Sequence, residues 1–292
     1  MFSGSLVALI TPMRADGSLD FDAWSRLLDL HAASGTSGVV VGGTTGESAT
    51  VSDSELGMLV ERACRQLGKR LPVIAGAGTS STAATVERVR WLGELPIAGL
   101  LIVTPAYNRP TQEGLYRHYE AIARASRVPV VVYNVPSRTA VDMLPATVAR
   151  VARLPNVVAV KEAVPQIDRV RELIAGSPAG FSVLSGDDAT AREAVLAGAR
   201  GVISVTANCV PLAMSDMIAA ALRGDAHEAA RLDAPLAALH RDLFLEANPI
   251  PAKWALQRMG LISAAIRLPL TELSATHVLQ LEAALRTAKA IQ

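Results

Sequence analysis

The 292-residue sequence is poor in cysteine, in aromatic residues and in net charge. Its two cysteines, Cys64 and Cys209, lie far apart and lack the spacing of a zinc site or redox motif, so we expect two small buried side chains. Aromatic residues make up 4% of the chain, and 28 basic against 27 acidic side chains leave a net charge of +1. This balance excludes the basic surface by which proteins bind nucleic acid, and we predict no such partner.

Long hydrophobic runs are absent as well. The first thirteen residues, MFSGSLVALITPM, contain an apolar run of about six residues without a basic flank, which is too short for a signal peptide or a membrane span. We therefore expect a soluble, cytoplasmic protein with no membrane contact. Half of the residues are nevertheless hydrophobic, which is ample for a large core and excludes a disordered chain.

Lysine is the scarcest charged residue: four lysines, at positions 69, 161, 253 and 289, stand against 24 arginines. Arginine stays protonated in proteins, whereas a desolvated lysine becomes a neutral amine that attacks carbonyl groups. The sequence thus offers few candidates for that chemistry.

Short, continuously apolar segments recur along the first three quarters of the chain and are typical of parallel strands covered on both faces. They span residues 5–10, 38–43, 72–77, 99–104, 129–134, 157–162, 181–186 and 201–206. Segments of helical periodicity lie between them, such as 21–33, 53–67 and 112–126, with Ser52 or Asp53 and Thr111 as N-cap candidates.

Eight such units in succession predict an α/β fold, a (β/α)8 TIM barrel, over residues 1–224. A doubly wound open sheet is the alternative, although the first strand ends in Thr11-Pro12 and not in a glycine-rich dinucleotide loop. After Gly224 the strand signal stops, and the segments 225–244, 249–260 and 270–290 have helical periodicity. We predict a C-terminal helical extension over residues 225–292.

Lys161 is the strongest candidate for a nucleophilic amine, because it is the one lysine within a predicted strand and lies near that strand's carboxyl end. Barrel enzymes place their sites at these ends, and burial lowers a lysine pKa toward neutrality. A structural alternative is a buried lysine paired with Glu162 or Asp187. Tyr133 ends the preceding strand, within reach of the Lys161 amine, and a tyrosine can move the protons that dehydration of a carbinolamine requires.

Other strand ends carry candidate binding groups. Thr44 and Thr45 follow a Gly-Gly turn whose hydroxyl and N–H groups suit a small carboxylate, Tyr107 lies in a loop between two prolines, and Arg138 suits an acidic substrate. Asp187 and Asp188 form an acidic pair, but every histidine falls on a predicted helix. We therefore predict no metal site, and no nucleotide site either, because the Walker and GxGxxG patterns are absent.

Eight strings spread over nearly the whole chain resemble the dihydrodipicolinate synthase family, within the wider superfamily of pyruvate-dependent aldolases and N-acetylneuraminate lyases. They are ITPM (10–13), GTTGESAT (43–50), TPAYNRPTQEGLY (104–116), YNVPSRT (133–139), VKEA (160–163), LSGDDA (184–189), GVISVTAN (201–208) and NPIPAKWA (248–255). So many strings in register make the resemblance specific.

The resemblance implies a role for each matching position. Lys161 would form an imine with pyruvate, and Tyr133 would act as the general acid and base through a relay with Thr44. Tyr107 would join that relay from an adjacent subunit. The binding positions would be Thr45 for the pyruvate carboxylate, Arg138 for the carboxylate of L-aspartate 4-semialdehyde, and Gly186 and Ile203 for lining the pocket. It further implies a homotetramer, no cofactor, and a product that feeds lysine and diaminopimelate biosynthesis.

The chain departs from the lysine-inhibited members of the family. Ser48 and Ala49 match their lysine site, but an imidazole, a carboxylate and an aromatic surface are missing, since the other positions are Asp53, Leu56, Ser80, Ala84 and Ala106. We predict weak or absent inhibition by lysine.

Two other functions share part of this pattern. A lyase acting on N-acetylneuraminate or a 2-keto-3-deoxy acid would have the same lysine and tyrosine, but such enzymes generally lack an arginine at the position of Arg138. The second alternative is not an enzyme: a barrel of this kind could bind pyruvate or another metabolite as a sensor. Steady-state turnover would exclude this function.

Overall fold

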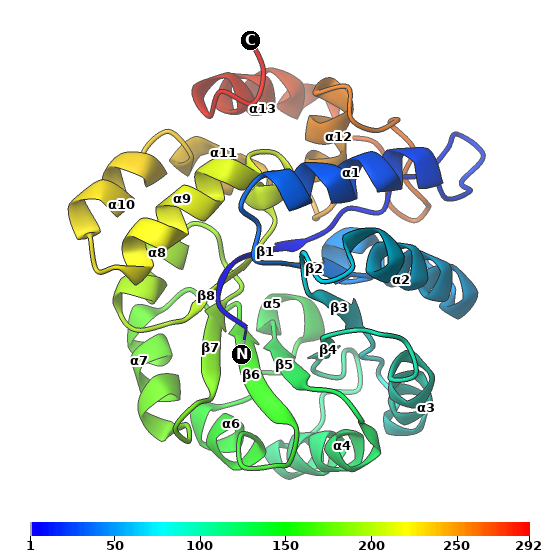
Figure 1. The fold of residues 1–292 in the computed structure, drawn as a ribbon, viewed down its shortest axis with the longest axis vertical. Helices are drawn as coiled ribbons and strands as arrows, with labels where there is room; N and C mark the ends of the chain where they lie inside the picture. The colour runs from blue at the N-terminus through cyan, green and yellow to red at the C-terminus, as the bar shows by residue number, and fades with distance from the viewer. Residues whose placement is uncertain (1) are drawn as a thin grey trace.

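The computed structural model describes residues 2–292, and its centre is a closed barrel of eight parallel strands (Figure 1). The strands are β1 (Gly4–Ala8), β2 (Gly38–Val41), β3 (Val73–Gly76), β4 (Gly99–Val103), β5 (Val130–Asn134), β6 (Val157–Glu162), β7 (Ser182–Ser185) and β8 (Gly201–Ser204). Each pairs with the next in sequence, and β8 pairs with β1 to close the ring. The predicted barrel is confirmed, and the alternative of an open sheet is wrong.

The strands are apolar on both faces because each face meets a different hydrophobic layer. In β5, Val131 and Tyr133 belong to the cluster inside the barrel, whereas Val130 and Val132 pack in the cluster beneath the surrounding helices. Both faces of the strands are covered by apolar side chains, and the polar residues Lys161, Ser185 and Ser204 lie at or next to the carboxyl ends of β6, β7 and β8. This arrangement gives the molecule one edge at which chemistry is possible.

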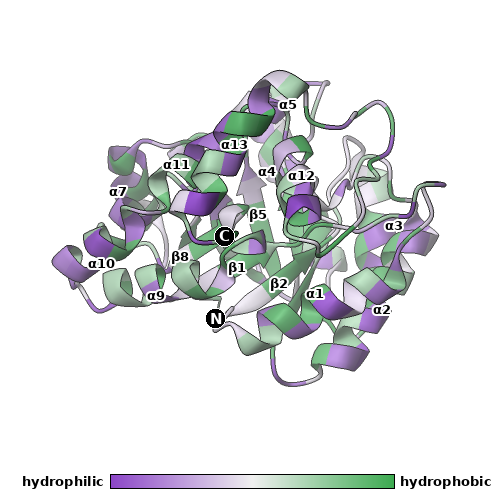
Figure 2. Cartoon of the chain, turned by 90° about the horizontal axis from the view of Figure 1, so that it is seen from above, coloured by the Kyte–Doolittle hydropathy of each residue, from purple (hydrophilic) through white to green (hydrophobic). Residues whose placement is uncertain are grey.

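The helices between the strands surround the barrel and turn their apolar faces inward (Figure 2). They are α1 (Phe21–Ala33), α2 (Asp53–Leu67), α3 (Thr82–Leu92), α4 (Gln112–Ala125), α5 (Pro136–Thr139), α6 (Pro145–Val151), α7 (Ile167–Gly176), α8 (Ala191–Leu196) and α9 (Pro211–Leu222), with short 3-10 turns η1 (Thr44–Gly46) and η2 (Thr206–Asn208). Ser52 begins α2 with a capping box to Glu55, and the Thr111 hydroxyl caps α4. The N-caps predicted there are confirmed.

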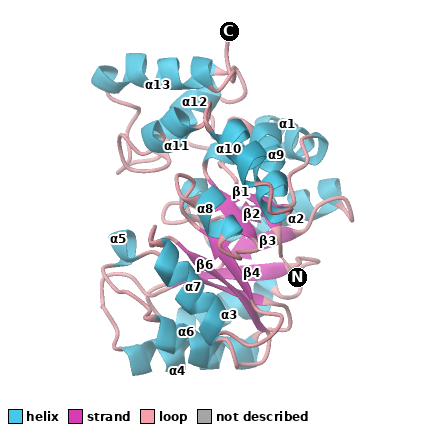
Figure 3. Cartoon of the chain, turned by 90° about the vertical axis from the view of Figure 1, so that its left-hand side faces the viewer, coloured by secondary structure: helices cyan, strands magenta, loops and turns pink. Residues whose placement is uncertain are grey.

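The C-terminal helices α10 (Ala226–Asp233), α11 (Ala237–Asp242), α12 (Ile250–Arg258) and α13 (Ala275–Thr287) follow the barrel, and α11 to α13 gather on one side of it (Figures 1 and 3). The expected single helix over 225–244 is wrong: Pro235 interrupts it, since proline cannot donate the backbone hydrogen bond that would continue α10. The last helix begins only at Ala275, after Ser274, and not at residue 270. No helix among residues 2–292 combines the length and apolarity that a membrane crossing requires.

Candidate active site

A cavity of about 520 Å³ opens at the carboxyl ends of the strands. It is lined by Thr45, Tyr133, Val135, Ser137, Arg138, Lys161, Ala163, Gly186, Asp187, Val205 and residues 244–248. Five of the predicted site residues, Thr45, Tyr133, Arg138, Lys161 and Gly186, therefore share one cavity, although they come from the carboxyl ends of four separate strands. The stretch 244–248 belongs to the C-terminal extension and was not predicted to take part.

Lys161 lies on β6 beside Tyr133 of β5, with which it pairs in register. Its Nζ atom is 4.4 Å from the centre of the Tyr133 ring, and the residue is 4% exposed. Burial lowers the pKa of the Lys161 amine to about 8; the Asp188 carboxylate opposes this shift and the Arg138 guanidinium adds to it. A substantial fraction of the amine is thus neutral near physiological pH.

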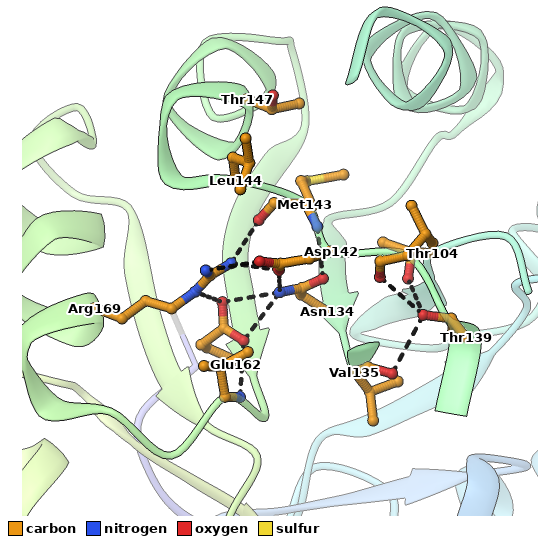
Figure 4. Close-up of polar contacts among 12 residues, drawn as sticks. Thr104, Asn134, Val135, Thr139, Asp142, Met143, Leu144, Thr147, Glu162 and Arg169 are labelled. Atoms are coloured by element: carbon orange, nitrogen blue, oxygen red, sulfur yellow. Dashed lines mark hydrogen bonds and ion pairs between the residues drawn. The ribbon is translucent and has the colours of Figure 1, made fainter. Parts of the chain in front are cut away.

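Lys161 forms no ion pair within residues 2–292, although a glutamate follows it directly. Successive side chains of a strand point to opposite faces, so Glu162 leaves the barrel while Lys161 enters the site. Outside, Arg169 Nε donates to Glu162 Oε2 at 3.0 Å and the Asn134 amide donates to both carboxylate oxygens at 3.1 Å (Figure 4). The Asp187 carboxylate instead accepts hydrogen bonds from Thr190. The pairs of Lys161 with Glu162 or Asp187 that the structural alternative requires are therefore not formed.

Tyr133 is buried, which raises the pKa of its phenol to about 12, and a hydrogen bond with the Thr44 side chain partly offsets that effect. Thr44 begins the 3-10 turn η1 directly after β2. Together they line a second, smaller cavity, which shares Tyr133 with the lysine site and also includes Ser48 and Arg88. A protonated phenol in contact with a threonine hydroxyl is a chain along which a proton can move.

Thr45 and Arg138 are connected through Asn248. The Asn248 side-chain amide donates to Thr45 Oγ1 at 2.9 Å, and Arg138 Nη2 donates to the Asn248 carbonyl at 3.2 Å. Asn248 is buried and lines the cavity. The sequence offered one signal for it, the NPIPAKWA string, but no spacing argument assigned it to the site.

Gly186 occupies a position where a side chain would crowd the amine. A Cβ atom there would lie 3.0 Å from Lys161 Cε and 3.1 Å from the Glu162 carbonyl. The space over the amine therefore depends on this glycine.

Besides Thr44, which lines the smaller cavity, two predicted site residues lie outside the main cavity. Ile203 is in the apolar cluster that fills the barrel with Tyr133 and Leu184, and it is not among the lining residues. Tyr107 is 94% exposed and lines neither cavity of its own chain. Its loop is nevertheless fixed: Ser80 Oγ donates to the Ala106 carbonyl at 2.9 Å, and Asn108 donates to the Ser80 carbonyl at 2.8 Å.

The described residues contain no cluster of three histidine, cysteine or acidic side chains with the geometry of a metal site. All five histidines lie on helices, and both cysteines are buried and free. The cavity thus offers an amine whose pKa is lowered to about 8, a phenol, hydroxyl groups, one guanidinium and, at its wall, the carboxylates of Asp187 and Glu246. Such a set can attack a carbonyl, move protons and hold carboxylates.

Comparisons with known proteins agree with this chemistry. The profile of the "Dihydrodipicolinate synthetase family" matches residues 1–288. The 4-hydroxy-tetrahydrodipicolinate synthase of Laribacter hongkongensis is 49% identical over 291 residues, covering all of both chains, and that of Alkalilimnicola ehrlichii is 52% identical over 277 residues, or 95% of each chain. The crystal structure of the chloride-inhibited dihydrodipicolinate synthase from Acinetobacter baumannii with pyruvate superposes with a TM-score of 0.98, at 45% identity and full coverage of both chains.

Proposed function

The chain belongs to the dihydrodipicolinate synthetase family, and we propose that Lys161 is the nucleophile with which it condenses pyruvate and L-aspartate 4-semialdehyde. The activity is that of 4-hydroxy-tetrahydrodipicolinate synthase, a lyase of lysine and diaminopimelate biosynthesis. One observation carries the assignment of the nucleophile: the Lys161 amine is buried, has a pKa of about 8 and pairs with no carboxylate of residues 2–292.

The first half of the reaction forms an imine. The neutral Lys161 amine attacks the carbonyl carbon of pyruvate, and the resulting carbinolamine loses water. Tyr133, whose phenol stays protonated at neutral pH because its pKa is about 12, donates the proton that the departing hydroxyl needs, with Thr44 next along the relay. The Thr45 turn holds the pyruvate carboxylate through its hydroxyl and backbone N–H groups.

The second half forms the carbon–carbon bond. The imine loses a methyl proton to become an enamine, whose carbon attacks the aldehyde carbon of the semialdehyde. Arg138 at the cavity wall binds the carboxylate of that substrate. The substrate's amino group then attacks the imine carbon, closes a six-membered ring and releases the Lys161 amine, so the enzyme returns to its starting state. The lysine serves as the electron sink, and the steps need no external cofactor.

The assembly that we propose is a homotetramer in which Tyr107 completes the relay of a neighbouring subunit. Tyr107 is exposed on a loop held by hydrogen bonds and lines neither of the two cavities at the strand ends, which supports a role across an interface. Light scattering after size exclusion measures the mass in solution. A monomer with full activity would contradict this role. We also place the enzyme in the cytoplasm, where its small anionic substrates are metabolised.

The choice of the second substrate is tested by a substrate panel. We expect turnover with L-aspartate 4-semialdehyde and much slower cleavage of N-acetylneuraminate or a 2-keto-3-deoxy acid. Replacing Arg138→Gln removes the bidentate carboxylate contact, so the KM for the semialdehyde should rise about tenfold or more while that for pyruvate changes little. Equal rates on a sugar acid would contradict the assignment.

A further inference from the structure

The turn that carries Thr44 and Thr45 ends in a strained residue. Glu47 follows η1 directly and has a φ of +58°, in the left-handed region that residues other than glycine rarely adopt. It is also buried, with 3% of its surface exposed. A buried, charged residue in this conformation persists only where its surroundings hold it.

The C-terminal extension supplies the groups that hold Glu47. Lys253, on α12, donates from Nζ to Glu47 Oε1, and the backbone N–H of Arg267 donates to Glu47 Oε2 at 3.1 Å. Lys253 is 2% exposed and also donates to the Ala265 carbonyl at 2.7 Å. Both oxygens of the carboxylate are thereby bound by one stretch of chain more than 200 residues away in sequence.

Arg267 extends this contact to the surroundings of the turn. Its guanidinium donates to the Thr50 carbonyl at 2.7 Å, to the Gly17 carbonyl at 2.7 Å and to both oxygens of Glu55. The segment before α12 adds Asn248, which binds the Thr45 hydroxyl. The C-terminal extension therefore contacts the turn at two points: at Thr45, which lines the cavity, and at Glu47, which does not.

We propose that Lys253, Glu47 and Arg267 form a clamp through which the C-terminal extension sets the position of Thr44 and Thr45 relative to Lys161. These three are positioning residues: none lines the lysine cavity, and they act through the turn. The proposal rests on the proposed function, because it concerns how the turn recognises the pyruvate carboxylate.

The energetics of buried ion pairs favour this role over stabilisation alone. Two buried charges lose their hydration, and apolar side chains of similar size often stabilise a protein equally well. What an ion pair adds is a fixed geometry, and here it fixes a residue two positions from Thr45. A displacement of about 1 Å in such a turn is enough to lower a rate up to 100-fold.

The test removes both charges of the clamp together, in the double variant Lys253→Met with Glu47→Gln, so that no buried charge is left unpaired. The matched control is Arg258→Met with Glu282→Gln, which removes an ion pair between α12 and α13 on the same extension. Borohydride trapping is measured with pyruvate and with acetone, in which a methyl group replaces the carboxylate. Thermal melts by circular dichroism define the temperature at which each variant is folded.

In the folded clamp variant we expect the preference for pyruvate over acetone to fall at least about tenfold, with acetone trapped at Lys161 as in the original chain. The control variant should retain the preference. An unchanged preference, or an equal loss with both ketones, would overturn the proposal and leave the ion pair a purely structural contact. Absence of any pyruvate adduct in the original chain would instead refute the proposed function, and the clamp's role with it.

Arg267→Gln provides a second test that does not depend on the folding of the double variant. Arg267 lies partly at the surface, and the substitution keeps its backbone N–H on Glu47 while removing the contacts to Gly17, Thr50 and Glu55. We expect the same change in preference at a smaller size, about threefold. No change in this variant would also contradict the clamp.

Discussion

The chain contains two buried lysines in opposite settings. Lys161 is 4% exposed and Lys253 is 2% exposed, and burial lowers the pKa of both amines. Lys253 nevertheless lies against the Glu47 carboxylate, which opposes the shift and favours the ammonium form. Lys161 has no such partner among residues 2–292. Burial alone therefore does not distinguish the two amines; the bound carboxylate does, and the amine without one is the candidate nucleophile.

The fold keeps carboxylates away from Lys161 in a specific way. Glu162 is directed out of the barrel and is bound by Arg169 and Asn134 (Figure 4). Asp188 acts on the amine from a distance, while one of its oxygens accepts the backbone N–H groups of Val205 and Thr206. Each nearby acid thus has another partner, and the amine remains available to substrate.

The largest difference between the two lysines should appear in turnover. Lys161→Met removes the nucleophile, and we expect turnover to fall on the order of 10⁴-fold or more. Stability should change by less than about 1.5 kcal/mol, because an unpaired amine is exchanged for an apolar chain of similar volume. Coupled assays and urea unfolding measure the two effects. A folded Lys161→Met protein with substantial turnover would contradict the assignment of Lys161 as the nucleophile, and with it the contrast to Lys253.

The opposite pattern is expected for Lys253→Met. This change leaves the Glu47 carboxylate buried and unpaired, so the free energy of unfolding should fall by about 3 kcal/mol, as measured by urea denaturation. Adding Glu47→Gln should restore part of that loss. If the single variant were as stable as the original chain, the Lys253–Glu47 ion pair would contribute less to stability than its burial implies.

The pH dependence of pyruvate trapping gives a further test of the difference between the two lysines. Imine formation requires the neutral amine, so the rate of pyruvate trapping should rise with pH and reach half of its plateau near the Lys161 pKa of about 8. At pH 7 about a tenth of the Lys161 amine is then neutral, far more than for an ordinary lysine. A midpoint close to 10 would mean that burial does not activate this amine.

The smallest expected effect concerns free lysine. Asp53 is paired with Arg88 at 2.5 Å, Leu56 is buried, and Ser80 donates to the Ala106 carbonyl. At these positions the one carboxylate is already paired with an arginine, and neither Leu56 nor Ala106 carries an aromatic ring that could hold an ammonium group. We expect weak or absent inhibition of the rate by millimolar L-lysine. Half-inhibition below one millimolar would contradict the prediction.

Much of the fold could be predicted because its signals are local and repeated. Eight apolar segments mark eight strands, and Ser52 and Thr111 mark helix starts. Pro235, which divides the helix expected over 225–244, is also a local signal, because proline cannot donate the hydrogen bond that would continue the helix. Helix boundaries are less well determined by local signals, as the start at Ala275 shows.

The site could be predicted only in part. Lys161 stands out as the one lysine within a strand, and strand ends of a barrel converge, which brings Tyr133, Thr45, Arg138 and Gly186 to one cavity. The contacts of Asn248 and Lys253 could not be derived, because they join residues 203 and 206 positions apart and no periodicity encodes them. The roles of Tyr107 and Ile203 remain predictions.

The most direct measurement is borohydride reduction in the presence of pyruvate, followed by intact mass and peptide mapping. The account predicts one reduced pyruvyl adduct per chain, on the peptide that contains Lys161, and none on the peptide that contains Lys253. No adduct, or an adduct on Lys253, Lys69 or Lys289, would contradict the claim that an unpaired buried amine at the end of β6 is the nucleophile.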